Sequence, residues 1–387
     1  MKKDMKKATK FAHIGRPKIG VSTSVNLPIT RSSTLLFAKA ADLYNDDLRL
    51  YGRHGSPVSD ALEEAFCELE NGAGCTLTSS GLAANTLSIQ AFTKAGDHIL
   101  VSDSSYGGTR YFCDNYLSKF GVDIEYFKPN IGKGIAGLIR HNTSCILLES
   151  PGSLTLEIND LPAIVEYARK HKITTIVDNT WSAGLVYNPL ELGADVATHA
   201  ATKYYSGHSD VMGGAIVART KLHANKVRLT AKALGNCVSQ DDVYQLLRGF
   251  RSVVTRFNQQ AETAVQLAKW LAKRPEVQDV RHPALPSHPD HKIWKRDFSG
   301  AGCIFSFVLN PCSEKRVLNF LDRLKLFGKG FSFGGYESVI IHCDPQLRRN
   351  FDPEFGGPLI RIGCGLEDVD DLQNDLQVSL EKTKFSD

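Results

Sequence analysis

The chain has 387 residues, of which 42% are hydrophobic and 23% are charged. A chain of this length can bury a large core and should fold into two or more domains. The formal net charge of +4 is a small excess of 46 basic over 42 acidic residues, so charge gives no reason to expect binding to nucleic acid or to an anionic membrane surface. The sequence also lacks an apolar run of about eighteen residues, so no membrane span is expected.

The nine cysteines are scattered along the chain and form no Cys-x-x-Cys pair. A disulfide framework or a structural zinc site would need them clustered. We therefore expect reduced thiols, a cytoplasmic protein and no bound metal. The lysine-rich start of the chain is followed by no apolar segment of signal-peptide length, and residues 1–10 are expected to be frayed.

Residues 1–55 are predicted to be an N-terminal arm, because from residue 11 onward they show little helical periodicity and several Gly, Pro and Ser. The arm carries the segment Tyr51-Gly52-Arg53. An arm with so little local pattern needs a surface to lie on, and a neighbouring subunit would provide one. We therefore expect a homo-oligomer of at least two chains.

The first strong helical pattern follows the arm. From Ser56 the apolar residues Val58, Leu62, Phe66 and Leu69 recur at helical spacing, and the pattern stops at Asn71-Gly72. Asn and Gly are typical residues just past a helix end, so this stop supports the helix.

A strand over 75–78, a turn of small residues and a helix over 82–95 come next. The order strand, turn, helix start is typical of an anion site, because the first amides of the helix are free and its dipole favours negative charge. We expect the amides of Gly81 and Leu82 to bind a phosphate group.

Three more predicted strands end in polar or aromatic residues. The strand over 97–102 leads to Tyr106, the strand over 144–148 leads to Glu149 through Ser153, and the strand over 173–177 ends at Asp178, with Trp181 a possible pocket wall. Open α/β sheets bind ligands at this end of their strands. A tyrosine there can lay its ring on a flat aromatic cofactor.

Strands alternate with helices from about residue 75 to 218, including a helix over 160–171. This alternation predicts an α/β fold with a mostly parallel sheet and helices on both faces. A long helical stretch then runs to about residue 274. We place a domain boundary within it, which gives the arm (1–55), a larger domain (56–250) and a smaller C-terminal domain (251–387).

Two segments of the C-terminal domain bear on function. The stretch 282–291 holds three histidines, but its three prolines oppose a metal site, so we interpret it as a structured surface loop. The strand predicted over 358–368 holds one arginine, Arg361, among apolar residues. Such a charge needs an anion, either a bound carboxylate or a structural ion pair.

Lys203 and Asp178 together suggest a specific chemistry. Lys203 is surrounded by small residues and a hydroxyl, which suits a crowded pocket that lowers a lysine pKa so that the amine can attack a carbonyl. Asp178 ends a buried strand, where a carboxylate can keep a pyridine nitrogen protonated. The pair predicts binding of pyridoxal 5′-phosphate (PLP).

Several motifs together resemble a known family. The segments 177–181 (Val-Asp-Asn-Thr-Trp), 201–210 (from Ala-Thr-Lys-Tyr to Gly-His-Ser-Asp) and 51–53 (Tyr-Gly-Arg) resemble the PLP-dependent Cys/Met-metabolism family of fold type I. The resemblance runs from about residue 11 to the C-terminus. It implies an aspartate aminotransferase-like fold with a smaller α/β C-terminal domain. Within the family, 149–153 and 331–338 look most like the bacterial cystathionine β-lyases.

The resemblance implies roles for the cofactor site. Lys203 would hold PLP covalently, Asp178 would face its pyridine nitrogen and Tyr106 would stack on its ring. Tyr51 and Arg53 would bind the cofactor phosphate of the adjacent subunit. Family members often have a phosphate-binding serine where this chain has Ala200, which leaves Thr202 as the hydroxyl for that task.

It also implies roles for the substrate site. Arg361, assisted by Ser332, would hold the substrate α-carboxylate. Ser153 stands where many γ-acting relatives have asparagine, which favours a β-lyase. Phe333 stands where some β-lyases have tryptophan, so the resemblance does not fix the width of the pocket.

The activity implied is β-elimination of L-cystathionine to homocysteine, pyruvate and ammonia, a step of transsulfuration in methionine biosynthesis, by a cytoplasmic homotetramer. The alternatives are a cystathionine γ-synthase or γ-lyase and a non-catalytic regulator on the same scaffold. A dehydrogenase is disfavoured because Gly72 and Gly74 precede a strand instead of following it. The hydrolase-like segment 330–334 lacks correctly spaced triad partners.

Overall fold

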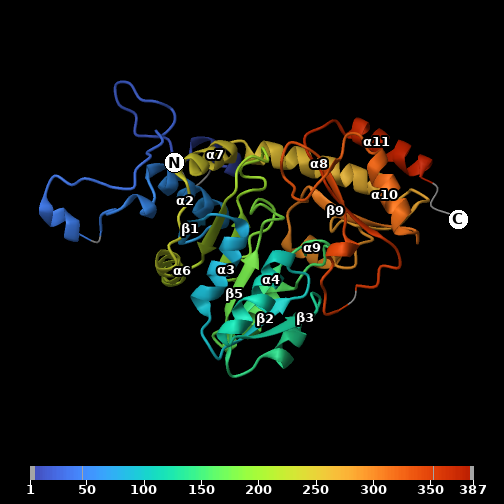
Figure 1. Ribbon diagram of the computed structural model, residues 1–387, viewed down its shortest axis with the longest axis horizontal. Helices are drawn as coiled ribbons and strands as arrows, with labels where there is room; N and C mark the ends of the chain where they lie inside the picture. Colours follow the sequence, from blue (N-terminus) through green and yellow to red (C-terminus); the bar gives the residue numbers. More distant parts are fainter. Residues whose placement is uncertain (1–4, 46, 352, 384–387) are drawn as a thin grey trace.

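The structure, a computed structural model, describes residues 5–45, 47–351 and 353–383. Two sheets with their helices form a larger and a smaller domain (Figure 1). The larger sheet contains β1 (Gly74–Thr78), β2 (His98–Ser102), β3 (Asp123–Phe127), β4 (Thr143–Glu149), β5 (Thr174–Asp178), β6 (Val196–Ala200) and β7 (Gly214–Ala218). The smaller sheet contains β8 (Val277–Arg281), β9 (Ile304–Leu309), β10 (Gly328–Lys329), β11 (Val339–His342) and β12 (Leu359–Gly363). The α-helices are α1 (Lys7–His13), α2 (Pro57–Glu70), α3 (Gly81–Phe92), α4 (Gly107–Asn115), α5 (Leu161–Lys170), α6 (Lys221–Ala233), α7 (Gln240–Phe250), α8 (Val253–Leu271), α9 (His291–Asp297), α10 (Glu314–Arg323) and α11 (Val369–Lys382).

The larger sheet confirms the predicted mostly parallel architecture. Its strand order is β1-β7-β6-β5-β4-β2-β3, and the strands from β6 to β3 pair in parallel. Only β7 departs from this pattern, since it runs antiparallel to both of its neighbours, β1 and β6. The carboxyl ends of β2, β4, β5 and β6 therefore meet at one edge of the sheet.

Helices cover both faces of this sheet, as predicted. Along β4, Ile146 and Leu148 belong to one hydrophobic cluster and Cys145 and Leu147 to another, because successive side chains of a strand point to opposite faces. The first cluster includes side chains from α2, α5, α7 and α8, and the second includes side chains from α3, α4 and α6. Both faces are thus buried, as a parallel sheet requires.

Local signals explain the first two helices of the larger domain. The hydroxyl of Ser56 accepts the N–H of Val58, and Asn71 ends α2 in a left-handed conformation with φ 54°, so both predicted ends of α2 are confirmed. The helix predicted over 82–95 is α3, which ends earlier, at Phe92.

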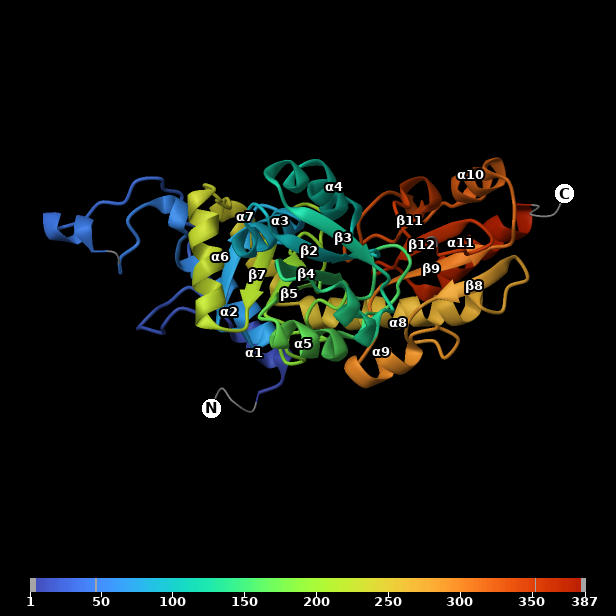
Figure 2. The same ribbon diagram turned by 90° about the horizontal axis from the view of Figure 1, so that it is seen from below.

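The long helical stretch before residue 274 consists of three helices, α6, α7 and α8. Helix α8 begins beside the larger domain and runs under the smaller one, where it contacts β8 and β9 (Figure 2). The predicted boundary near residue 250 falls at the end of α7, and the division into domains at that point stays an interpretation.

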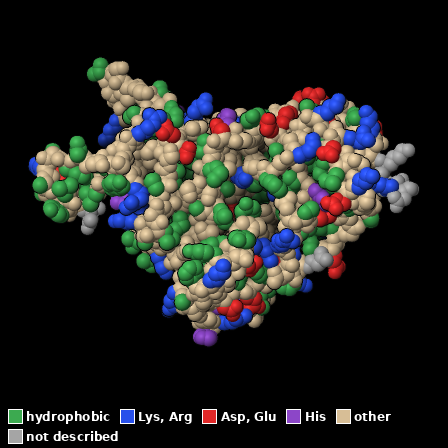
Figure 3. All heavy atoms as spheres, in the orientation of Figure 1, with side chains coloured by type: hydrophobic (Ala, Val, Ile, Leu, Met, Phe, Trp, Pro, Cys, Tyr) green, Lys and Arg blue, Asp and Glu red, His purple; other side chains and the backbone are tan. Residues whose placement is uncertain are grey.

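The N-terminal segment differs in part from the prediction. Residues 1–4 lie outside the described residues, but Lys7–His13 form α1, and Phe11 is fully buried against Phe250, so this part is not frayed. Beyond α1 the chain leaves the body as an extended arm (Figure 1). Hydrophobic side chains gather on the arm's surface (Figure 3), among them Val21, Leu36 and Tyr44.

The segment 282–291 is largely a loop of turns with exposed residues at Pro286, Ser287 and Pro289, as the sequence suggested, but two of its histidines are not on the surface. His282 and His288 are buried, and each accepts a backbone N–H two residues ahead with its Nδ1. Burial lowers the pKa of His282 to about 4 and that of His288 to about 3, so both rings are neutral turn caps. No cluster of three or more potential metal ligands occurs among the described residues. No helix in the described part of the chain is long and apolar enough to cross a bilayer.

Candidate active site

Lys203 lies in the turn that follows β6, at the carboxyl edge of the larger sheet. Its Nζ donates a hydrogen bond of 2.7 Å to Oγ of Ser332 and lies 5.1 Å from the ring centre of Phe333. Burial, reinforced by the positive charge of Arg361, lowers the pKa of Lys203 to about 8. The structure thus brings Lys203 together with the adjacent pair Ser332 and Phe333 and with the charge of Arg361, all distant from it in the sequence. It also gives the lysine the property that imine chemistry needs.

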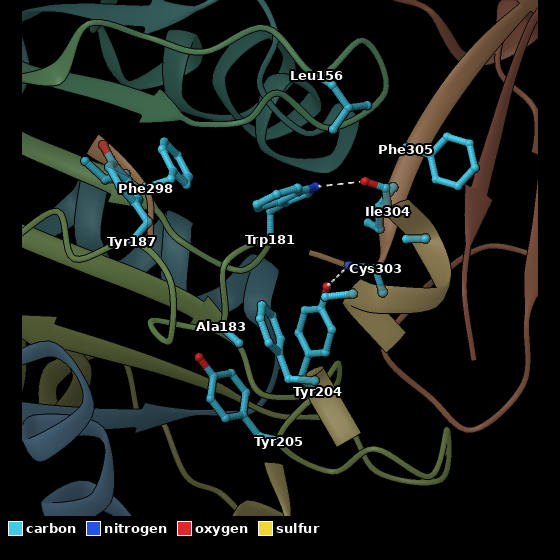
Figure 4. Close-up of a cluster of buried hydrophobic side chains, with 14 of the residues drawn as sticks. Leu156, Trp181, Ala183, Tyr187, Tyr204, Tyr205, Phe298, Cys303, Ile304 and Phe305 are labelled. Atoms are coloured by element: carbon cyan, nitrogen blue, oxygen red, sulfur yellow. Dashed lines mark hydrogen bonds between the residues drawn. The ribbon is translucent and has the colours of Figure 1, made fainter. Parts of the chain in front are cut away.

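The smaller domain holds the Lys203 turn from one side (Figure 4). The N–H of Cys303 donates to the hydroxyl of Tyr204 at 3.0 Å, and the indole N–H of Trp181 donates to the carbonyl of Ile304 at 3.2 Å. Trp181 is buried in this cluster, so the suggestion that it forms a pocket wall is wrong. It is instead a core residue that ties the loop after β5 to β9.

A second buried network supports the turn from the α2 side. Nε2 of His199 lies 2.8 Å from a carboxylate oxygen of Glu70, and the hydroxyl of Tyr205 lies 2.8 Å from Nδ1 of the same imidazole. The amide of Asn179 donates to the same carboxylate at 2.6 Å. These four residues are buried, and they connect the neighbours of Asp178 and of Lys203 behind the site.

Asp178 ends β5 and is held by three hydrogen bonds from the protein. Its Oδ1 accepts the N–H of Thr180 at 3.0 Å and the hydroxyl of the same residue at 2.6 Å, and its Oδ2 accepts the amide of Asn85 at 2.8 Å. Asn85 was not predicted as a site residue from the sequence. The available signal was an amide among the apolar residues of a predicted helix, since a buried amide requires polar partners.

Tyr106 stands between β2 and α4, with 47% of its surface exposed. Its N–H donates to Oε2 of Glu149 at 2.6 Å, and its ring occupies the space where a side chain at Gly108 would lie. Burial, followed in importance by the nearby Asp178 carboxylate, raises the pKa of Glu149 well above its ordinary value. Glu149, also missed as a site residue, is the register partner of Asp178 in the sheet.

Arg361 occupies the centre of β12, between Ile341 and Ser306 on the neighbouring strands. It is 8% exposed, and its Nη1 donates to the carbonyl of Ser153 at 3.2 Å. Burial lowers the pKa of Arg361 from its ordinary value. No carboxylate within the described ranges forms an ion pair with it, although the charge of Glu149 acts on it. The structural ion pair considered from the sequence is therefore not found among these residues. A buried guanidinium with one carbonyl partner is suited to bind an anion.

The start of α3 faces the Lys203 turn. Ser80 caps the helix by accepting the N–H of Ala83 at 3.0 Å, which leaves the first amides, those of Gly81 and Leu82, for a ligand. A Cβ on Gly81 would lie 2.4 Å from that of Ala200. Glycine is therefore required for this close approach of α3 to the end of β6.

Known proteins with the same pattern settle the family. The family model described as Cys/Met metabolism PLP-dependent enzyme matches residues 8–381. The chain belongs to this family. It is 43% identical to a putative cystathionine beta-lyase of Rhizobium johnstonii (95% of this chain and 94% of the relative) and 42% identical to a cystathionine beta-lyase of Haemophilus influenzae (97% and 98%). Its fold matches cystathionine gamma synthase of Xanthomonas oryzae pv. oryzae, in complex with aminoacrylate and cysteine, with a TM-score of 0.91, 32% identity and 98% of both chains covered.

Membership confirms the predicted PLP dependence and fold type, and the residues present fit the cofactor. Lys203 offers a buried amine for its aldehyde, Asp178 offers an acceptor for its pyridine nitrogen, and the start of α3 offers the amides of Gly81 and Leu82 for its phosphate. The exposed ring of Tyr106 offers a flat surface beside them. The individual roles of these residues stay predictions.

Thr202 and Arg53 were predicted to bind the cofactor phosphate, but within the single chain both contact other groups of the protein. The hydroxyl of Thr202 exchanges hydrogen bonds with the backbone of Gly213, at 3.1 and 3.2 Å. Arg53 lies over the ring of Tyr51 at 5.4 Å and lines a cavity of about 230 Å³ with Glu63 and others. The structure of a single chain does not bring Tyr51 and Arg53 to Lys203, and their action on a neighbouring subunit stays a prediction.

Ser332 has an unusual backbone. Its φ is 99°, a value that favours glycine, yet its hydroxyl is the partner of Lys203. Non-glycine residues in this region are strained and persist where surrounding structure fixes them. Nearby, Gly334 has φ 76°, and a Cβ there would meet the backbone of Tyr204 at 2.8 Å. The segment that carries Ser332 is thus pressed closely against the Lys203 turn.

Proposed function

We propose that the chain catalyses the β-elimination of L-cystathionine, using one water to give L-homocysteine, pyruvate and ammonia. The single observation that carries this proposal is the buried Lys203 amine between Ser332, Asp178 and Arg361 in a chain whose relatives at 43% and 42% identity are named cystathionine beta-lyases. PLP, when bound, supplies an electron sink for the charge that develops at the substrate Cα.

In the proposed mechanism Lys203 acts first as the attachment point of the cofactor and then as the base. With a pKa of about 8, its amine is neutral often enough near neutral pH to take the Cα proton. Asp178 holds the pyridine N–H, and Arg361 binds the substrate α-carboxylate with its guanidinium fork. The hydrogen bond from Arg361 to the Ser153 carbonyl then places the substrate backbone beside the loop after β4.

The γ-acting members of the family are the alternative, because they are expected to share Lys203, Asp178, Tyr106 and Arg361. β-Elimination is favoured by the hydroxyl of Ser153, which hydrogen-bonds to Glu149 at the position where many γ-acting relatives have asparagine. A regulator without activity would not need the lowered pKa of Lys203.

Product analysis with purified, PLP-loaded protein separates these functions. Incubation with L-cystathionine should release pyruvate and homocysteine in equal amounts. Cysteine with 2-oxobutyrate would move the assignment to the γ-lyases, and no product would favour the regulator. Lys203→Ala is the matched control, because it should release neither pair of products and should not be labelled when borohydride is added.

We also propose that the protein is a cytoplasmic homotetramer that serves methionine biosynthesis. All nine cysteines are free thiols, as expected in a reducing compartment. The exposed apolar residues of the arm need a partner surface, and a second copy of this chain would supply it. Light scattering of the purified protein gives the mass of the assembly, and a monomer would contradict the proposal.

A further inference from the structure

Asn85 is a polar residue on the buried side of α3, and it hydrogen-bonds directly to Asp178. It is 2% exposed and lies among Ala84, Leu87 and Ile89, which belong to the cluster between α3 and the sheet. A buried amide without partners would destabilise the fold, so its hydrogen bonds identify its purpose. Those bonds lead to three different elements.

The contacts of Asn85 determine which way its amide points. Nδ2 donates to Oδ2 of Asp178 at 2.8 Å and to the hydroxyl of Thr109, on α4, at 3.1 Å, while Oδ1 accepts the hydroxyl of Thr198, on β6, at 2.5 Å. An ionised carboxylate only accepts hydrogen bonds, so the amide nitrogen must face Asp178. The two threonines therefore hold Asn85 as a donor to that residue.

The hydrogen bonds at Asp178 then leave one acceptor position. A carboxylate has about four lone-pair positions, two on each oxygen. The backbone and hydroxyl of Thr180 occupy both positions on Oδ1, and Asn85 occupies one on Oδ2. The remaining position, on Oδ2, is the one available to a pyridine N–H.

We propose that Asn85 is a positioning residue that directs the last lone pair of Asp178 toward the pyridine nitrogen of PLP. It acts by holding Oδ2 in place, and so it controls both the affinity for the cofactor and the protonation of its ring. This inference rests on the proposed role of Asp178. It assigns a function to a residue of α3 that does not touch the substrate.

The test measures the cofactor alone, without substrate. In Asn85→Leu, which removes the donor at similar volume, the dissociation constant for PLP, obtained by equilibrium dialysis, should rise about tenfold or more, as expected for a hydrogen bond to a charged group. The pH at which the visible absorbance of the bound cofactor changes should shift. Three other ionisable residues interact electrostatically with Asp178, namely Glu149, Lys203 and Tyr205. All three are unchanged in this variant.

Ser88→Ala is the matched control. Ser88 is buried on α3, and its hydroxyl donates to the carbonyl of Ala84 at 2.7 Å without contacting the site. This variant should keep the parent dissociation constant within twofold. If Asn85→Leu does not fold, Thr198→Val removes the donor to Oδ1 of Asn85 and should act in the same direction to a smaller extent.

Combining two variants distinguishes a purely structural role of Asn85 from the proposed positioning of Asp178. In an Asp178→Asn background, Asn85→Leu should change PLP affinity and absorbance less than twofold, because the carboxylate that it directs is gone. Equal effects of Asn85→Leu in both backgrounds, or no effect in the parent, would overturn the proposal. If Asp178→Asn itself leaves binding and absorbance unchanged, the role of Asp178 fails as well. The identity of the elimination products has no influence on these readouts.

Discussion

At the scale of single residues, the protonation of Lys203 decides when the site can capture its cofactor. Only the neutral amine attacks an aldehyde, and burial lowers the pKa of this amine to about 8. The rate of PLP uptake by cofactor-free protein should therefore rise as the pH increases through about 8 and level off above it. Stopped-flow absorbance measures this rate. A rise centred near the ordinary lysine pKa would show that Lys203 is not desolvated in solution.

Candidate site residues could be predicted from the sequence where a charged residue lies in or beside an apolar strand. Lys203, Asp178 and Arg361 fall in this group, because each places a charge next to a strand or inside one. Asn85 and Glu149 were missed because their function depends on partners from other elements, Asp178 and Tyr106. Such contacts are visible only once the strands are arranged side by side.

At the scale of elements, a buried ionic clasp holds the loop before β12 against the end of β2. The carboxylate of Asp103 accepts Nη1 of Arg110 at 2.8 Å, Nε of Arg349 at 2.9 Å, and the backbone N–H groups of Asn350 and Phe351 at 2.9 and 3.0 Å. Burial alone would raise the pKa of Asp103, but these donors outweigh it and lower the pKa. The clasp thus joins the two domains next to Tyr106 and Ser153.

Loss of this clasp should destabilise the protein. Asp103→Asn leaves the buried Arg110 without its carboxylate and leaves Arg349 with only Glu157 of its two carboxylate partners. It should lower the free energy of unfolding by about 3 kcal/mol, measured by urea denaturation. Because the folded pKa of Asp103 lies below the unfolded value of 3.8, its contribution is present above that pH and is lost as the pH falls through the folded pKa. The acid limb of the stability profile should therefore be shallower in the variant.

An exposed pair provides the control for this prediction. Asp123 pairs with Arg140 on the surface, where the two side chains are 59% and 47% exposed. Asp123→Asn should change the free energy of unfolding by less than about 1 kcal/mol. Equal losses in the two variants would contradict the importance of the clasp.

At the scale of the whole molecule, the proposed sharing of sites between subunits predicts complementation. Arg53→Ala and Lys203→Ala should each be inactive as pure proteins, because one lacks the phosphate ligand given to the neighbour and the other lacks the base. Mixed assemblies contain some sites with both residues intact. Co-refolding of the two variants should thus restore part of the pyruvate release from cystathionine.

The control is a mixture of two differently tagged Lys203→Ala proteins, which should stay inactive although they assemble. Failure of the mixed Arg53→Ala and Lys203→Ala assemblies, shown by their tags to have formed, would place both residues in the same chain's site. In that case Arg53 would act on the site of its own chain and not on that of a neighbour.

The overall architecture was predictable because it depends on alternation along the chain. The alternation of strands and helices between β1 and β7 and both ends of α2 followed from local patterns, but β3, β6 and α4 were not predicted individually. The antiparallel direction of β7 and the burial of His282 could not be predicted in this way. The residues of an apolar strand do not indicate its direction relative to its neighbours, and a histidine in a loop does not indicate whether it is buried. Both depend on contacts between segments distant in sequence.

The left-handed backbone of Ser332 has a consequence for protein engineering. Ser332→Gly should relieve the strain, so the free energy of unfolding of this variant should be about 1 kcal/mol higher than that of Ser332→Ala. Both variants lose the hydroxyl that hydrogen-bonds to Lys203, and both should turn over more slowly. Thermal denaturation measures the difference in stability between the two variants, and steady-state kinetics measures their loss of activity. A laboratory selection for heat resistance would then enrich glycine at this position and discard catalytic power, whereas a selection for growth would retain the serine.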